Sequence, residues 1–138
     1  MKTSDNGIKF IMENEGVVLH SYCDSVGYQT IGVGHKIEAY DNFPDQISEE
    51  EAMILLSQDL QRIEDAVNSL VEVPLTQNQF DALIDFSFDV GTGAFQRSTL
   101  LQLLNSGQYD AVPDQFMRWT KQPELIGRRQ REIDLWNT

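Results

Sequence analysis

The first apolar stripe of the chain lies in residues 4–15, where Ile8 and Ile11 recur at the spacing of one helix face. Glu15 continues this stripe, and Gly16 follows it directly. Glycine readily adopts the left-handed backbone that closes a helix. The pattern therefore predicts an N-terminal helix whose last residue is an acid on an otherwise apolar face.

Residues 17–35 change to the alternation of polar and apolar positions that is typical of strands. Asp24-Ser25-Val26-Gly27 interrupts this alternation and predicts a polar turn. We therefore expect a β-hairpin, followed by a loop over residues 37–47 that contains Asp41 and Pro44 as structure breakers.

The rest of the chain returns to helical spacing. Ser48 with Glu51, and Thr76 with Gln79, have the capping-box pattern at the start of apolar seams. The expected helices cover residues 48–71, 76 to about 90, 99–104, about 109–119 with Pro113 near the first turn, and a final segment after Gly127. A small hairpin among many helices predicts a mostly helical α+β fold with its strands at one end.

A chain of 138 residues is most simply one domain, which we expect to consist of two lobes. The hairpin-bearing lobe is predicted over about 13–58. The helical lobe is predicted over about 72–138, together with the N-terminal helix 4–15. The long helix would join the two lobes, and a groove between such lobes is a common ligand site.

The composition is ordinary for a globular protein, with 41% hydrophobic and 23% charged residues. No stretch reaches the ~18 consecutive apolar residues of a membrane span, and MKTSDNGIKF has no apolar core that would indicate a signal peptide. We therefore expect neither stable membrane insertion nor secretion by such a signal. Cys23 is the single cysteine, so no intramolecular disulfide can form.

The net charge of −12 is unusual and uneven along the chain. Residues 1–96 carry 17 acidic and 4 basic groups, whereas residues 97–138 carry 5 and 6. Such a surface repels polyanions, so nucleic-acid binding is disfavoured. Solubility is the plainest explanation of this charge.

Glu15 and Asp24 are expected in contrasting surroundings. The apolar helix face should keep the Glu15 carboxyl protonated, and the polar turn should keep Asp24 ionised. Two such carboxyl groups are what acid-assisted glycoside cleavage requires. Thr30, on the second strand, could hold a water molecule with its hydroxyl. Spacing alone leaves open that all three are ordinary surface or strand residues.

Further motifs join these residues. The segment reads Glu15-Gly16, Tyr22-x-Asp24 and Gly27-Tyr28-x-Thr30-Ile31-Gly32-x-Gly34-His35. Later blocks are Gln79-Phe80-Asp81-Ala82-Leu83, Phe86-Ser87-Phe88, Val90-Gly91-x-Gly93-Ala94-Phe95, Ser98-Thr99-Leu100, Trp119, Gly127-Arg128-Arg129, Glu132 and Leu135-Trp136. In this order and spacing, the blocks resemble the phage-type lysozymes of glycoside hydrolase family twenty-four, the T-even phage type.

The resemblance implies a lysozyme-like fold and hydrolysis of the β-1,4 bond between N-acetylmuramic acid and N-acetylglucosamine in peptidoglycan glycan strands. Carried over by position, Glu15 is the general acid, and Asp24 with Thr30 places and activates water. This arrangement is similar to an inverting mechanism, in which the carboxyl groups are roughly 6.5–9.5 Å apart. The resemblance implies no metal and no cofactor.

Other positions receive weaker roles from the resemblance. Lys36, Phe88 and Ser98 match positions that contact the saccharide. His35 matches a structural histidine that pairs with an aspartate of the following helix, here Asp59. That pairing would raise the pKa of His35.

The sequence also departs from the family pattern. Asp89 stands where relatives usually carry an amide residue. A third carboxylate there would disfavour ionisation of Glu15 and broaden the alkaline side of the pH–rate profile, unless Asp89 points to solvent. The segment between Trp119 and Arg128 lacks a double glycine that is common in relatives, which leaves substrate contacts there open.

The preferred interpretation is a monomeric phage endolysin that stays in the host cytoplasm until a separate membrane pore gives it access to the wall. A catalytically silent peptidoglycan-binding module and a lytic transglycosylase remain alternatives. A thiol hydrolase using Cys23 and His35 is disfavoured because no third orienting group accompanies them.

Overall fold

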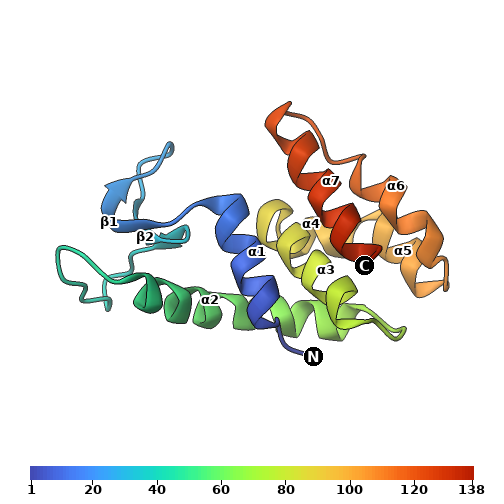
Figure 1. The fold of residues 1–138 in the computed structure, drawn as a ribbon, viewed down its shortest axis with the longest axis horizontal. Coiled ribbons are helices and arrows are strands. Elements are labelled where there is room, and N and C mark those ends of the chain that lie inside the picture. Colours follow the sequence, from blue (N-terminus) through green and yellow to red (C-terminus); the bar gives the residue numbers. More distant parts are fainter. The chain divides into compact units, whose positions relative to one another are not determined.

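The computed structural model describes the whole chain, residues 1–138 (Figure 1). The elements are α1 (Asp5–Glu15), β1 (Val18–Cys23), β2 (Gln29–Gly32), β3 (His35–Lys36), α2 (Glu49–Leu70), α3 (Gln77–Val90), α4 (Thr92–Gln96), α5 (Thr99–Asn105), the 3-10 helix η1 (Tyr109–Ala111), α6 (Val112–Phe116) and α7 (Glu124–Trp136). Helices dominate around one small sheet, so the predicted mostly helical α+β class is confirmed.

Two compact units divide the chain. Residues 8–61 form the hairpin-bearing unit, and residues 1–7 with 62–138 form the helical unit. The divisions fall inside α1 and α2. The lobe boundaries expected from the sequence stay a prediction.

The sheet of the hairpin-bearing unit is antiparallel, with strand order β1-β2-β3. The expected hairpin is formed by β1 and β2, where Tyr22 lies opposite Thr30. A further short strand follows, in which His35 lies opposite Ile31. Gly32 and Gly34 have φ angles of 70° and 68°, and this left-handed backbone turns the chain from β2 into β3.

A small apolar core holds the sheet against the N-terminal half of α2. One buried cluster consists of Ile31 of β2, Ile47 of the loop that precedes α2, and Ala52 of α2. The loop over 37–47 is fixed to β1, because the Ile47 N–H donates to the Leu19 carbonyl at 2.8 Å. This loop is the predicted one, and packing, this backbone bond and an isolated bridge between His20 and Gln46 hold it in place.

The helical unit is built around α3, whose residues from Phe80 to Ser87 are all buried. α7 lies along α3 (Figure 1). The Phe86 ring makes edge contacts with Phe95, Phe116 and Trp119, with ring centroids 5.3–6.4 Å apart. None of the helices combines the length and the apolar character that a membrane span needs.

The predicted helix starts at Ser48 and Thr76 are confirmed by reciprocal capping-box bonds. At Ser98 the hydroxyl caps α5, accepting from the Leu101 N–H at 3.1 Å. These caps are local interactions, so spacing along the chain is enough to predict them.

Two helical segments differ from the sequence-based expectation, and the short helix α4 was not among the expected helices. α7 begins at Glu124 and contains Gly127 instead of following it, because one glycine costs a helix only about 1 kcal/mol. The segment 109–119 divides into η1 and α6, and Pro113 lies in the first turn of α6 as expected. Proline has no backbone N–H to donate to the carbonyl one turn earlier, so a continuous helix through this segment would lack that hydrogen bond.

Candidate active site

Glu15 is the last residue of α1, and Gly16 ends the helix with a φ of 79°. The side chain of Glu15 is exposed, so the expectation of apolar surroundings for this carboxyl group is wrong. Ile8 and Ile11 of the same helix face are buried, but this burial does not extend to the last residue of the helix. A Cβ placed on Gly34 would lie 4.0 Å from Oε1 of Glu15, which puts this carboxyl beside the β2–β3 turn.

Asp24 follows β1 and organises the polar turn. Its Oδ1 accepts hydrogen bonds from the N–H groups of Val26 at 3.0 Å and Tyr28 at 2.8 Å. The half-buried side chain is thus oriented by the backbone, as the turn sequence predicts.

Thr30 lies in β2 with only 3% of its surface exposed. Its hydroxyl donates to the Tyr28 carbonyl at 3.0 Å. Because a hydroxyl has one proton and two lone pairs, its oxygen is left to accept a hydrogen bond from a third group. A water molecule is a suitable donor.

Asp24 and Thr30 are thus joined through the same residue. Tyr28 donates its N–H to Asp24 and accepts the Thr30 hydroxyl at its carbonyl. Glu15 approaches the following turn at Gly34. All three residues belong to the hairpin-bearing unit: Glu15 ends α1, Asp24 lies in the β1–β2 turn and Thr30 lies in β2.

His35 in β3 is bound between two aspartates. Its Nδ1 lies 2.7 Å from Asp59 of α2, which confirms the expected pairing, and its Nε2 lies 2.9 Å from Asp41. Burial lowers the pKa of His35, but hydrogen bonds and charge from Asp41 and Asp59 outweigh it and raise the pKa above its ordinary value. The Asp41 contact was missed, because the loop sequence gives no sign of where this side chain points.

Asp41 responds in the opposite direction. The Glu38 N–H donates to it at 2.7 Å, and His35 contacts the same oxygen. These bonds, with the backbone bond as the larger cause, lower the pKa of Asp41. The three side chains are therefore a structural charge cluster that links β3, the following loop and α2.

The weaker saccharide-contact predictions fall in both units. Lys36 is exposed in β3, with its Nζ 4.4 Å from the centroid of the Tyr28 ring. Phe88 is half-buried on α3. Ser98 is buried, and its hydroxyl also donates to the Phe95 carbonyl at 2.6 Å. The bonds of Ser98 are those of a helix cap, and its contact with a saccharide stays a prediction.

Asp89, near the end of α3, is ion-paired with α7. Arg129 Nη2 binds its Oδ2, and Arg128 Nη1 lies 3.5 Å from Oδ1. Asp89 is therefore neither a solvated side chain nor an unpaired third carboxylate. The ion pairs with Arg129 and Arg128 offset part of the charge of Asp89. A tuning role for Asp89 stays a prediction.

A second carboxyl pair lies deeper in the helical unit. Arg128 binds Asp85 through two hydrogen bonds of 2.9 and 3.1 Å, and Arg129 Nη1 donates to Glu132 at 2.6 Å. Asp85, Arg129 and Glu132 are fully buried. The sequence signal for this network was available: an acid within the apolar run of α3 and adjacent arginines late in the chain.

Glu132 differs from its neighbours in charge state. Burial, together with the hydrogen bond and charge of Asp85, raises the pKa of Glu132 to about 10 against the opposing effect of Arg129. A neutral carboxyl at Glu132 has an O–H that can donate a hydrogen bond to Asp85, and its buried Oε2 has no other hydrogen-bond partner. Asp85 is thus shared between Glu132 and the guanidinium of Arg128.

Sequence comparison places these features in a known family. The family model described as phage lysozyme matches residues 12–132. The chain belongs to the phage lysozyme family. This phage lysozyme match includes Glu15, Asp24 and Thr30, although it assigns no roles to them.

Individual relatives extend the likeness over the full chain. The endolysin of Salmonella phage P22 is 45% identical over 143 residues, covering 99% of this chain and 98% of that protein. The crystal structure of a P22 lysozyme mutant has a TM-score of 0.92 at 42% identity, covering 100% of this chain and 99% of that one. The muramidase domain of SpmX from Asticaccaulis excentricus has a TM-score of 0.89 at 35% identity, covering 99% and 98%.

Proposed function

We propose that this phage lysozyme is an endolysin that hydrolyses peptidoglycan and lyses the bacterial host. Its specific activity is that of a muramidase, which cleaves the β-1,4 bond between N-acetylmuramic acid and N-acetylglucosamine. The observation that carries this proposal is that Asp24 and Thr30 both bind the backbone of Tyr28 while Glu15 lies beside the β2–β3 turn, within the range that matches the family.

Glu15 acts as the general acid. Its carboxyl group protonates the glycosidic oxygen as the bond from that oxygen to the sugar C1 breaks, and it is reprotonated from solvent after the product leaves. An exposed position at the helix end suits this role, because the proton must be replenished in each cycle.

Asp24 and Thr30 prepare the attacking water. The Thr30 oxygen accepts a hydrogen bond from one O–H of the water and thereby orients the molecule. Asp24 removes the proton of the other O–H as the water oxygen bonds to C1, and the first proton stays on the new C1 hydroxyl. Attack on the face opposite the leaving group inverts the configuration at C1. The carboxyl separation that this mechanism requires stays a prediction.

The enzyme acts as a monomer on glycan strands, without a cofactor. It accumulates in the host cytoplasm and reaches the wall through a pore made by another protein. Fractionation of infected cells before lysis tests this localisation, since activity in the membrane fraction would contradict it.

Product analysis is the decisive experiment. Purified enzyme and a Glu15→Gln variant are incubated with peptidoglycan, and the products are examined by mass spectrometry and by the anomeric NMR signal of the new reducing end. We expect hydrolysed ends with N-acetylmuramic acid at the reducing terminus, formed as the α anomer, and no turnover by the variant.

The two alternatives give different results in the same experiment. A lytic transglycosylase would leave anhydro ends. A silent binding module would retain peptidoglycan in a sedimentation assay but release no fragments, and Glu15→Gln would then behave as the wild type. Either result would overturn the proposed muramidase activity.

A further inference from the structure

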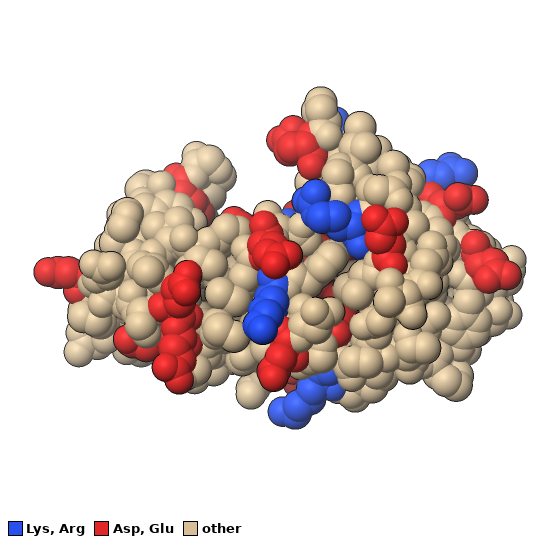
Figure 2. Space-filling model, viewed as in Figure 1, with Lys and Arg blue, Asp and Glu red and all other residues tan.

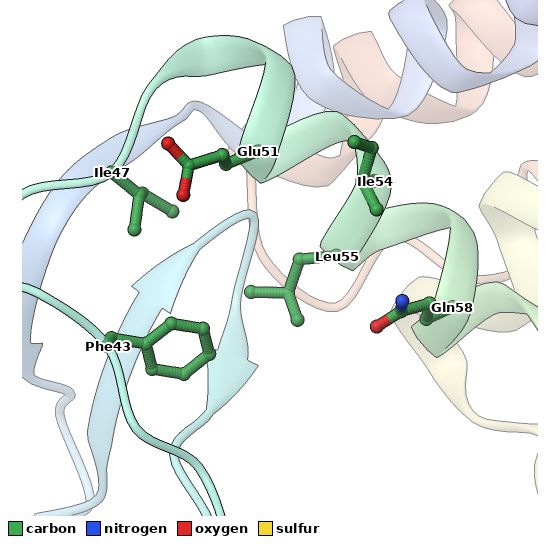
Figure 3. Close-up of a pocket in the computed structure, with 6 residues that line it drawn as sticks. All are labelled: Phe43, Ile47, Glu51, Ile54, Leu55 and Gln58. Atoms are coloured by element: carbon green, nitrogen blue, oxygen red, sulfur yellow. The ribbon is translucent and has the colours of Figure 1, made fainter.

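A pocket of about 210 Å³ lies beside the first turns of α2 in the hairpin-bearing unit (Figure 3). It is lined by Phe43, Ile47, Glu51, Ile54, Leu55 and Gln58. A protein cavity of about 150 Å³ holds a benzene molecule. The pocket can therefore hold one aromatic ring together with a short chain, and it is too small for a saccharide strand.

The apolar wall of the pocket is part of the packed core of the hairpin-bearing unit. Ile47 belongs to the buried core cluster, and Phe43 and Leu55 pack against the same cluster. The Phe43 ring also makes an edge contact with His35, at a centroid distance of 5.8 Å. Ile54 remains 53% exposed at the rim. A preformed apolar wall with an exposed apolar rim favours a ligand with an apolar body.

One carboxylate gives the pocket its charge preference. Glu51 carries the only charge among the six lining residues. Its Oε1 accepts from the Ser48 N–H and hydroxyl at 3.2 and 3.1 Å, which holds the side chain in place. Oε2 is left to accept from a ligand, and Figure 3 shows the carboxylate at the same side of α2 as Ile47 and Leu55.

The surroundings add to the preference for a cation. Residues 8–61 contain 10 acidic and 2 basic residues, a net charge of −8. Glu49 and Glu50 stand next to Glu51 in the first turn of α2, and Lys9 and Lys36 are the two basic residues of the unit. An anionic ligand would be repelled here, whereas a cationic one is attracted.

We propose that this pocket binds a small hydrophobic ammonium ion, with its ring against Phe43, Ile47 and Leu55 and its charged nitrogen at Glu51. No assigned role of the chain involves this pocket, and binding there does not depend on Glu15, Asp24 or Thr30. A hydrophobic amine is therefore a second class of ligand for the protein.

Three probes of similar shape test the proposal: phenethylammonium, 2-phenylethanol and 3-phenylpropionate. Each is titrated into isotopically labelled full-length protein at low salt, and NMR shifts of the pocket amides and methyl groups are followed. We expect phenethylammonium to bind with a dissociation constant on the order of 1 mM. The alcohol should bind about threefold more weakly, and the anion weaker still.

Matched variants separate the carboxylate from the general field of the unit. Glu51→Gln keeps the capping box, since glutamine serves the same position, but removes the charge. The affinity of the Glu51→Gln variant for phenethylammonium should fall to that of the wild type for 2-phenylethanol. Glu50→Gln removes the same charge from the same turn without touching the pocket, and it should leave the threefold preference in place.

Salt provides a test that needs no variant. Raising the ionic strength from about 0.02 M to about 0.5 M screens an exposed ion pair, so the preference for the cation should disappear while alcohol binding stays constant. Equal affinity of the three probes at low salt would overturn the proposal. Shifts that map outside the pocket, or an equal loss of affinity in Glu50→Gln and Glu51→Gln, would overturn it as well.

Discussion

Thr30 shows how a single hydrogen-bond direction constrains chemistry at the residue scale. Its hydroxyl proton goes to the Tyr28 carbonyl, so the oxygen is an acceptor for water. We expect Thr30→Val to lower the rate of peptidoglycan hydrolysis by about 100-fold or more, and to lower the free energy of unfolding by only about 1 kcal/mol. Thr30→Ser, which keeps the hydroxyl, should retain most of the activity.

Turbidity loss of peptidoglycan and urea unfolding of the same protein samples separate the two effects. A valine variant that remains active would remove Thr30 from the mechanism. A loss of activity that matches a large loss of stability would show that the residue acts only through folding.

Glu132 makes the stability of the protein depend on pH. Its pKa in the folded protein lies above the value of about 4.3 expected for an unfolded chain, so its contribution is complete below about pH 4.3 and is lost as the pH rises toward about 10. We expect Glu132→Gln, an analogue of the neutral acid, to weaken this decline and to be at least as stable as the wild type at pH 8. Urea unfolding at pH 5, 6.5 and 8 measures the difference.

Asp85→Asn is the matched control for this network. It replaces the carboxylate that binds the buried guanidinium of Arg128 at 2.9 Å, so we expect a loss of about 3–5 kcal/mol at pH 7. If Glu132→Gln were as damaging as Asp85→Asn, Glu132 would have to be an ionised partner of Arg129 rather than a neutral acid.

At the scale of elements, the His35 cluster connects β3, the loop over 37–47 and α2. The raised pKa of His35 means that its contribution to stability is complete below about pH 6.5 and is lost as the pH rises through the folded value. The lowered pKa of Asp41 means that its contribution is present above about pH 3.9 and is lost as the pH falls through its folded value. The cluster is therefore most effective between these limits.

We expect His35→Gln to destabilise the protein by about 1–3 kcal/mol near pH 5.5 and by clearly less at pH 3 and pH 9. Thermal unfolding of both proteins at the three pH values tests this window. A constant difference across all three would mean that the histidine contributes packing alone.

The elements that local patterns define were predicted from sequence. Ser48, Thr76 and Ser98 cap helices at the expected positions, and the β1–β2 hairpin forms around Asp24. The predictions failed where tertiary packing decides the outcome. Gly127 lies inside a helix, and the two-residue strand β3 exists because it pairs with β2.

The site was predictable only in part for the same reason. Residue order placed Glu15, Asp24 and Thr30 near one another, whereas the exposure of Glu15 depends on what covers the end of α1. Asp41 binds His35 from within a loop, and Asp89 binds Arg129, which lies 40 residues later in the chain. The spacing of apolar and polar residues does not predict contacts of either kind.

At the scale of the whole molecule, the net charge of −12 opposes approach to an anionic cell wall. Acidic groups predominate among the charged side chains over the hairpin-bearing unit on the face in Figure 2. We expect the initial rate of wall hydrolysis to rise between about 0.02 M and about 0.15 M salt, because screening reduces this repulsion. A rate that falls steeply with ionic strength, measured as turbidity loss, would contradict this expectation.

Asp24 and Thr30 both bind the backbone of Tyr28, and this has a consequence for protein engineering. The Asp24 carboxylate and the Thr30 hydroxyl are both oriented by backbone atoms of Tyr28, so the segment 24–30 contains the groups that orient these two side chains. Transplanting the whole segment into another two-stranded hairpin would transfer the acid and the hydroxyl as one module. Copying only the two side chains onto a different turn would remove the backbone hydrogen bonds that orient them.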